Sequence, residues 1–224
     1  MAGGGQAEPE YGPVAGERVA GKDDGVESVD AVEDPRARFE SRLSGLRGRR
    51  VLAVDYWDVH NFDSEPARWD YGDWHHAVLG VGLATDVGPV SLTWTSTFFP
   101  YGVEVFHDRI EDHLVLGEGG PERVGPGAGS TWDRYLGTPV LGTAARWQRL
   151  ELGPSRRSDG SVVGPARAVD VPTAVRLDFA AGPVWFVAAI PRPPEWRRAF
   201  VGGDEIVIVF SPGKMREIGF DAAL

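Results

Sequence analysis

The pattern of hydrophobic and polar positions changes twice along the chain. Residues 1–33 show no apolar periodicity and hold a single aromatic residue. Phe39, Leu43 and Leu46 then recur at spacings of four and three, behind an Asp-Pro pair at residues 34–35. Such a stripe is typical of an amphipathic helix, and Asp followed by Pro is typical of its first turn. We therefore expect a disordered segment over 1–33 and a short helix where the ordered part begins.

Beyond this helix, alternation of apolar and polar residues predicts strands. The pattern is clearest over 90–98, where Val90, Leu92 and Trp94 alternate with Ser and Thr. We expect this strand to be half-buried, with Trp94 facing the core and the Ser/Thr face in solvent. Further strands are expected over 50–58, 75–85, 103–106, 143–152, 166–180, 183–190 and 204–210, with short helical turns after Phe106 and Ser211 and a loop over 117–130.

These elements define the fold class. Eight or nine short strands, separated by Gly- and Pro-rich turns, predict a mostly-β protein. We expect a single-domain β-sandwich or partly closed barrel over residues 34–224, with two or three short helices, preceded by the acidic disordered tail 1–33. Residues 83–90 resemble residues 177–184, and each stretch is followed by a further strand and a short helix. Duplication of a β-meander and convergent Gly-Pro turn chemistry would both explain this likeness.

Net charge excludes some classes of partner. The 224 residues carry a net charge of −10, and residues 1–34 alone hold nine acidic and two basic residues. The remainder is therefore nearly neutral, without the basic surface that a phosphate backbone requires. The longest apolar stretch, residues 184–190, is too short to span a bilayer. We expect neither nucleic acid nor a membrane as a partner.

Composition narrows the chemistry further. The chain has no Cys, which excludes disulfides, thiolate nucleophiles and Cys-ligated metals. No phosphate-binding loop, zinc-protease motif or serine-hydrolase motif is present, so no cofactor is expected. The sequence shows no signal-peptide pattern, which favours a cytoplasmic location. The basic residues are 21 Arg and only two Lys, which is typical of GC-rich, actinobacterium-like coding.

Residues 55–76 combine aromatic and acidic side chains at the highest density in the chain. Aromatic rings pack on the apolar faces of sugars or attract cations, and carboxylates accept hydrogen bonds from hydroxyl and ammonium groups. Six acids and one base between residues 55 and 73 favour a neutral or cationic ligand. The candidate ligand-binding residues are Tyr56, Trp57, Asp58, Trp69, Asp70, Tyr71, Asp73 and Trp74. Alternatively, the same rings only anchor a long loop to the domain.

The segment 107–113 is a second, weaker candidate. His107, Glu111 and His113 carry donor atoms that zinc, manganese or iron accept. Their spacing matches no known ligand signature, and a solvated helix face explains it equally well.

These patterns leave two classes of function open. The first is a non-catalytic binding or interaction module, whose acidic and aromatic surface takes a neutral or cationic small molecule or a protein partner. The second is a hydrolase-like enzyme that uses the Asp/His constellation, with or without a metal. We favour the first class because no nucleophile, metal or cofactor motif in the chain is specific.

The tail itself yields a testable prediction. Because residues 1–33 lack the apolar surface needed to pack on a domain, deleting them should leave the melting temperature almost unchanged. Calorimetry on the full chain and the deletion variant measures this difference. A loss of several degrees would show that the tail packs on the folded part.

Overall fold

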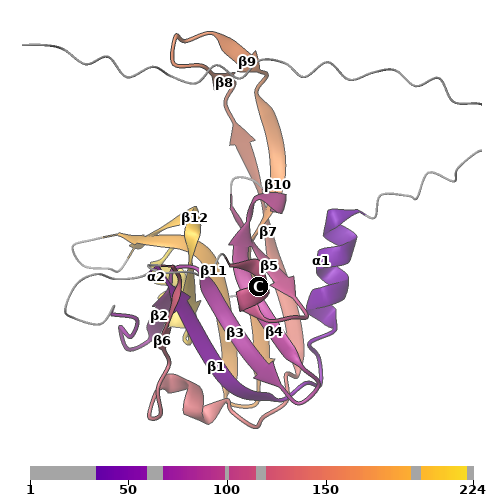
Figure 1. Ribbon diagram of the computed structural model, residues 1–224, viewed down its shortest axis with the longest axis vertical. Coiled ribbons are helices and arrows are strands. Elements are labelled where there is room, and N and C mark those ends of the chain that lie inside the picture. Colours follow the sequence, from indigo (N-terminus) through magenta and orange to yellow (C-terminus); the bar gives the residue numbers. More distant parts are fainter. Residues whose placement is uncertain (1–33, 60–67, 99–100, 115–119, 193–197, 221–224) are drawn as a thin grey trace, which may run out of the picture. The chain divides into compact units, whose positions relative to one another are not determined.

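The computed structural model describes residues 34–59, 68–98, 101–114, 120–192 and 198–220 (Figure 1). These residues all belong to one compact unit, Glu33–Leu224. The tail predicted over 1–33 and part of the predicted aromatic loop, residues 60–67, lie outside the described residues. No helix within the described ranges is long and apolar enough to cross a membrane.

The first half of the chain builds one antiparallel sheet of five strands. Its strands are β1 (Val51–Asp58), β3 (Gly80–Thr85), β4 (Pro89–Thr95), β5 (Gly102–Phe106) and β6 (Glu122–Gly125). Their order in space is β5-β4-β3-β1-β6, so that β1, β3, β4 and β5 form a meander and β6 extends it beyond β1.

The second sheet is also antiparallel and five-stranded. Its strands are β2 (Trp74–Ala77), β7 (Gly142–Leu152), β10 (Arg167–Phe179), β11 (Gly182–Arg192) and β12 (Arg198–Val209). The order is β2-β12-β11-β10-β7, so that a strand from the first half completes the edge of this sheet. A small hairpin of β8 (Ser155–Arg156) and β9 (Val162–Gly164) lies between β7 and β10 in the sequence.

The two sheets bury a common core between their inner faces. Val81 and Leu92 of the first sheet and Leu177 and Phe186 of the second are at most 2% exposed and belong to one hydrophobic cluster. This arrangement confirms the predicted mostly-β sandwich, and the described strands form no closed barrel.

The helices begin where the sequence predicts and close the ends and faces of the sandwich. Helix α1 (Pro35–Ser44) starts at Asp34, whose carboxylate accepts a hydrogen bond from the amide of Arg36. Helix α2 (Pro212–Glu217) starts at Ser211 in the same way. Met215 and other residues of the C-terminal segment pack on Trp74 and Trp185, which covers the outer face of the second sheet. Three short 3-10 helices complete the structure: η1 (Ser96–Phe98), η2 (Ile110–His113) and η3 (Thr131–Arg134).

The prediction of a single strand over residues 75–85 is wrong. The structure splits it into β2 and β3, which belong to different sheets. The chain crosses from one sheet to the other over residues 78–79 and enters β3 at Gly80, whose φ is +141°. A side chain there would place Cβ 2.6 Å from the carbonyl oxygen of Leu92. Gly80 is therefore required by both the backbone conformation and the close approach of β4.

The solvated Ser/Thr face predicted over 90–98 is also wrong in part. Ser91 is fully buried and Thr93 is 5% exposed, because η2 packs over this face of the sheet. The strand ends at Thr95 and continues as η1. Two other elements differ from expectation: the helical turns after Phe106 reduce to the four residues of η2, and the predicted loop 117–130 contains β6.

The two similar stretches of sequence occupy equivalent hairpins. In the β3–β4 hairpin Leu83 pairs with Val90 and Ala84 with Pro89. In the β10–β11 hairpin Leu177 pairs with Val184 and Asp178 with Pro183, in the same register. The likeness in sequence therefore corresponds to a likeness in strand pairing.

Gly80 offers a test of the crossing between the sheets. Gly80→Ala should destabilise the fold by about 2 kcal/mol or more, because the positive φ and the contact with β4 both disfavour a side chain. Gly153→Ala is the control, since its Cβ would meet open space, and should change stability by less than about 0.5 kcal/mol. Chemical denaturation measures both values. Equal effects of the two substitutions would contradict the crossing at Gly80.

Candidate functional site

A row of small residues leaves a hollow on the outer face of the first sheet. Gly80, Gly82 and Ala84 alternate with the core residues of β3, so their side of the strand carries almost no side-chain volume. Ile110 of η2 fills the end of this row near Gly80, where it is 1% exposed. The remaining space, beside Gly82 and Ala84, is a hollow of about 300 Å³.

Four charged side chains line this hollow. Asp55 of β1 and Glu111 of η2 both lie beside Arg123 of β6, at 3.3 and 3.6 Å between the charged atoms. Arg109, next to η2, also lines the hollow, and within the described residues its guanidinium makes no ion pair. The lining therefore balances two carboxylates against two guanidinium groups, one of which is available to a ligand.

Trp57 supplies an apolar part of the lining. It lies on β1 opposite Gly80 and is 8% exposed, with the guanidinium carbon of Arg123 5.7 Å from its ring centre. Its indole nitrogen is buried, and the described residues offer it no hydrogen-bond acceptor. Together with Ile110, Trp57 gives the hollow one apolar surface between charged groups.

The pKa of the Asp55 carboxyl is raised by its surroundings. Burial raises the pKa of the Asp55 carboxyl above its ordinary value, the positive charge of Arg123 lowers it, and the negative charge of Glu111 raises it again. Asp55 will therefore take up a proton at a higher pH than an ordinary aspartate.

The predicted aromatic residues of segment 55–76 mostly face inward. Tyr56, Trp57 and Trp74 are at most 8% exposed, and Trp69 packs at the edge of the main core. Tyr71 is half-buried and stacks on Trp74 with ring centres 4.2 Å apart. Of the eight candidate residues, Trp57 lines the hollow and the others do not.

The predicted acids of the same segment are scattered. Asp58 is 7% exposed, and burial raises its pKa, while the hydrogen bond from its neighbouring amide, Val59, lowers it. Asp70 and Asp73 are exposed, and Asp70 accepts a hydrogen bond from the amide of Gly72 in the turn before β2. None of these three carboxylates lines the hollow.

Tyr56 instead belongs to a buried hydrogen-bond chain that sequence reasoning missed. The indole of Trp132 donates to the Tyr56 hydroxyl, which in turn lies 2.7 Å from Nδ1 of His75. Because the hydroxyl accepts from Trp132, its own proton is assigned to the bond with Nδ1, and Nε2 then carries the imidazole proton. The carboxylate of Asp70 lies 3.6 Å from Nε2, beyond hydrogen-bond distance.

Tyr56, His75 and Asp70 place a hydroxyl, an imidazole and a carboxylate in the order found in hydrolases. The hydroxyl and the imidazole are, however, closed to substrates. Tyr56 and His75 are fully buried, and burial raises the pKa of Tyr56 well above its ordinary value. Burial also lowers the pKa of His75 to about 4, against the opposing effect of Asp70, so the imidazole is neutral at pH 7. The contact therefore lies inside the core, without solvent access to either side chain.

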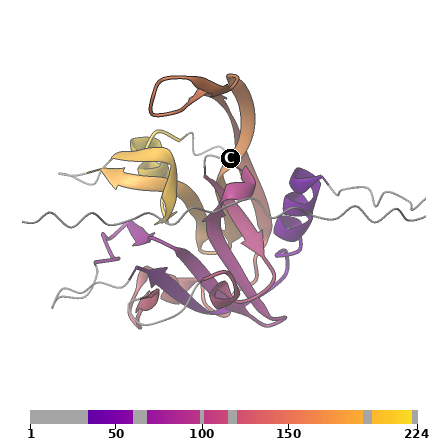
Figure 2. The same ribbon diagram turned by 45° about the horizontal axis from the view of Figure 1, so that its top comes forward.

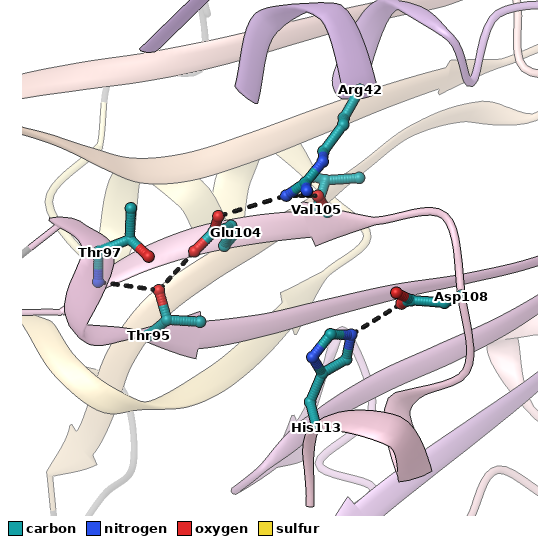
Figure 3. Close-up of polar contacts among 7 residues, drawn as sticks. All are labelled: Arg42, Thr95, Thr97, Glu104, Val105, Asp108 and His113. Carbon is teal, nitrogen blue, oxygen red and sulfur yellow. Dashed lines mark hydrogen bonds and ion pairs between the residues drawn. The ribbon is translucent and has the colours of Figure 1, made fainter. Parts of the chain in front are cut away.

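The three weak metal candidates are held apart by different partners. Nε2 of His107 lies 2.8 Å from the carbonyl oxygen of Arg42, and Glu111 pairs with Arg123. His113 lies 2.7 Å from Asp108 (Figure 3). Within the described ranges, no group of three His, Asp or Glu side chains has the geometry to hold a metal ion.

Figure 3 also shows the carboxylate of Glu104, which lies above the pair of His113 and Asp108 in this view. Glu104 is 3% exposed, accepts a hydrogen bond from the hydroxyl of Thr95, and lies 3.5 Å from Nη1 of Arg42. Through the ion pair with Arg42, Glu104 connects helix α1 to β5 at the edge of the first sheet. In the described part of the chain, no Ser or Thr hydroxyl is hydrogen-bonded to a histidine.

Sequence reasoning named Trp57 and Glu111 from two separate segments, and the structure brings both to one hollow. It missed Arg109 and Arg123, which match no motif. Comparison with known proteins adds no further assignment, since no family model, curated protein or solved structure matches this chain.

The neutral state of His75 gives a pH-dependent prediction. The unfolded chain binds a proton at this histidine near pH 6.5 but the folded chain only near pH 4, so stability falls as the pH drops through this window. The loss attributable to His75 should reach about 3 kcal/mol below pH 4. His75→Asn keeps an acceptor for Tyr56 but does not titrate, and should lose correspondingly less stability between pH 7 and pH 4.

The measurement is urea denaturation of both proteins across this range. Carboxylates that titrate in both proteins cancel in the comparison. His107→Asn, which removes an exposed histidine, is the matched control. Parallel pH profiles for wild type and His75→Asn would contradict a buried neutral imidazole.

Proposed function

We propose that this protein is a non-catalytic binding module that holds a small, polar, uncharged molecule in the hollow on the outer face of the first sheet. The observation that carries the proposal is the convergence of Asp55, Glu111, Arg109 and Arg123 on a space of about 300 Å³ beside Trp57. These side chains come from three separate segments of the chain, namely β1, the segment around η2 and β6, and Trp57 gives the space an apolar surface.

The size and lining of the hollow favour a hydroxylated ligand. Ligand sites in proteins measure about 300–1,000 Å³, so this hollow suits a molecule at the small end of the range. Carboxylates accept hydrogen bonds from hydroxyl groups and guanidinium groups donate to them, which lets one polyol use both kinds of side chain. Trp57 and Ile110 would contact its C–H groups. A molecule the size of a monosaccharide meets all of these conditions.

The balance of charge favours a neutral ligand over a cationic one. A cation would have to displace Arg123 from Asp55 and Glu111, and would then leave two guanidinium groups without counter-ions. A neutral ligand leaves these ion pairs in place and adds the free guanidinium of Arg109. We therefore narrow the neutral or cationic ligand expected from the sequence to a neutral one.

Two substitutions test the proposal by different means. Asp55→Asn keeps the shape of the side chain but removes its charge, and should weaken binding of a neutral polyol about 10-fold or more. Ala84→Leu places a larger side chain in the hollow from an exposed strand position and should abolish binding. Asp170→Asn, on an exposed strand far along the chain, is the matched control and should bind like wild type.

The measurement is calorimetric titration with glucose, galactose and inositol, and separately with methylammonium chloride. Saturable binding of at least one neutral probe, lost in Ala84→Leu, would support the proposal. Binding of methylammonium alone would contradict the neutral ligand. Equal affinities of Asp55→Asn and Asp170→Asn would show that the hollow is not the site.

A further inference from the structure

The hairpin between β7 and β10 extends away from the sandwich as an arm. Figure 1 and Figure 2 both show the ends of these strands, together with β8 and β9, projecting beyond the two sheets. We define the arm as residues 148–170. Residues 153–163 at its tip are all exposed, including Val162 and Val163, which are each 55% exposed.

The arm is a two-stranded ribbon with two different faces. Leu150 pairs with Val169, which puts both on one face, and Leu152 lies on the same face. The opposite face carries Arg149, which lies within 3.7 Å of Glu151 and within 3.9 Å of Asp170 between charged atoms. At the base of the arm Leu150 and Val169 are partly buried against the main hydrophobic core, whereas residues 153–163 are exposed. A two-stranded ribbon without such packing is marginally stable in water, so the projecting part of the arm gains from a further strand.

One edge of the arm is open to such a strand. β7 is the edge strand of the second sheet, and among the described strands it pairs only with β10. Helix α1 lies against the first part of β7, where Glu40 accepts a hydrogen bond from the indole of Trp147. Beyond Trp147, residues 148–152 contain no Pro and expose their outer edge, which is the usual template for strand addition.

We propose that two copies of this chain associate through residues 148–152 of β7, paired antiparallel about a two-fold axis at Leu150. Leu150 then faces Leu150 of the second copy, and Arg149 faces Glu151 of the second copy on the polar side. Each arginine lies between Asp170 of its own chain and a glutamate of the other. The apolar face becomes a continuous row of two leucines flanked by two valines.

The charges select this register over its neighbours. A slip by one residue would place Leu150 opposite a charged residue and would turn the apolar face of one strand to the polar face of the other. A slip by two residues would place Arg149 opposite Arg149 of the second copy, or Glu151 opposite Glu151, and like charges directly opposite each other are destabilising. The register centred on Leu150 alone pairs opposite charges and joins the apolar residues. The association is independent of the hollow on the first sheet.

A pair of charge variants tests the proposed register. Light scattering after size-exclusion chromatography should give wild type twice the 24.2 kDa mass of the chain at sufficient concentration. Arg149→Glu alone and Glu151→Arg alone should each be monomeric, because both place like charges opposite each other. A mixture of the two variants should recover the dimer, since each then meets opposite charges. Arg157→Glu, at the tip outside the paired residues, is the control and should remain dimeric.

A cross-link provides a second measurement that does not depend on charge. The chain has no Cys, so Leu150→Cys introduces a single thiol. Residues directly opposite in an antiparallel pair have Cα atoms about 4.5–5.5 Å apart, within the range that a disulfide spans. Leu150→Cys should therefore form a covalent dimer on mild oxidation much faster than Ser155→Cys. A monomeric wild type at high concentration, a mixture that stays monomeric, or equal cross-linking of the two Cys variants would each overturn the proposal.

Discussion

The buried hydrogen bond between Tyr56 and His75 joins the two sheets. Tyr56 belongs to β1 in the first sheet, whereas His75 belongs to β2, a strand from the same half of the chain that lies in the second sheet. Trp132 completes the chain of donors from η3. Buried polar groups are costly unless they are paired, so each member restricts where the other two can lie. The position of β2, the crossing at Gly80 and the distance between the sheets all have to satisfy this contact.

The hollow follows from how differently the outer faces of the two sheets are covered. On the second sheet, α2 and the following segment bury Trp74, Trp185 and Phe220 in a second hydrophobic cluster. On the first sheet, the four-residue η2 covers only part of the face, and β3 beneath it has little side-chain volume. A space therefore remains where charged residues from β1, β6 and η2 meet. The hollow is thus a consequence of a short helix over a strand of small residues, which no single motif in the sequence encodes.

Periodicity and capping residues predicted most elements, but not how the layers cover each other. Asp34 and Ser211 identified the two helix starts correctly because capping is a local interaction. Alternation identified the core side of β4, yet it could not reveal that η2 buries Ser91 and Thr93 on the other side. The aromatic residues near β1 and β2 looked like a binding surface because sequence alone cannot distinguish an exposed indole from a buried one. Residue type singled out Trp57 as a ligand-binding candidate and Glu111 as a weak metal candidate, whereas Arg109 and Arg123 become notable only once folding brings them to the same hollow.

The two halves of the chain share the same order of strands. They differ in the insertion between their first two strands, and this difference concerns the arm. β1, β3, β4 and β5 form a meander in one sheet, and β7, β10, β11 and β12 form the equivalent meander in the other. Each half carries an insertion between its first and second strands. In the first half this insertion contains β2, which pairs with β12 and completes the sheet of the other half. In the second half it contains β8 and β9, which pair only with each other among the described strands. The first insertion finds its partner within the chain, whereas the second extends beyond it, so the natural partner for that arm is the same arm of another copy.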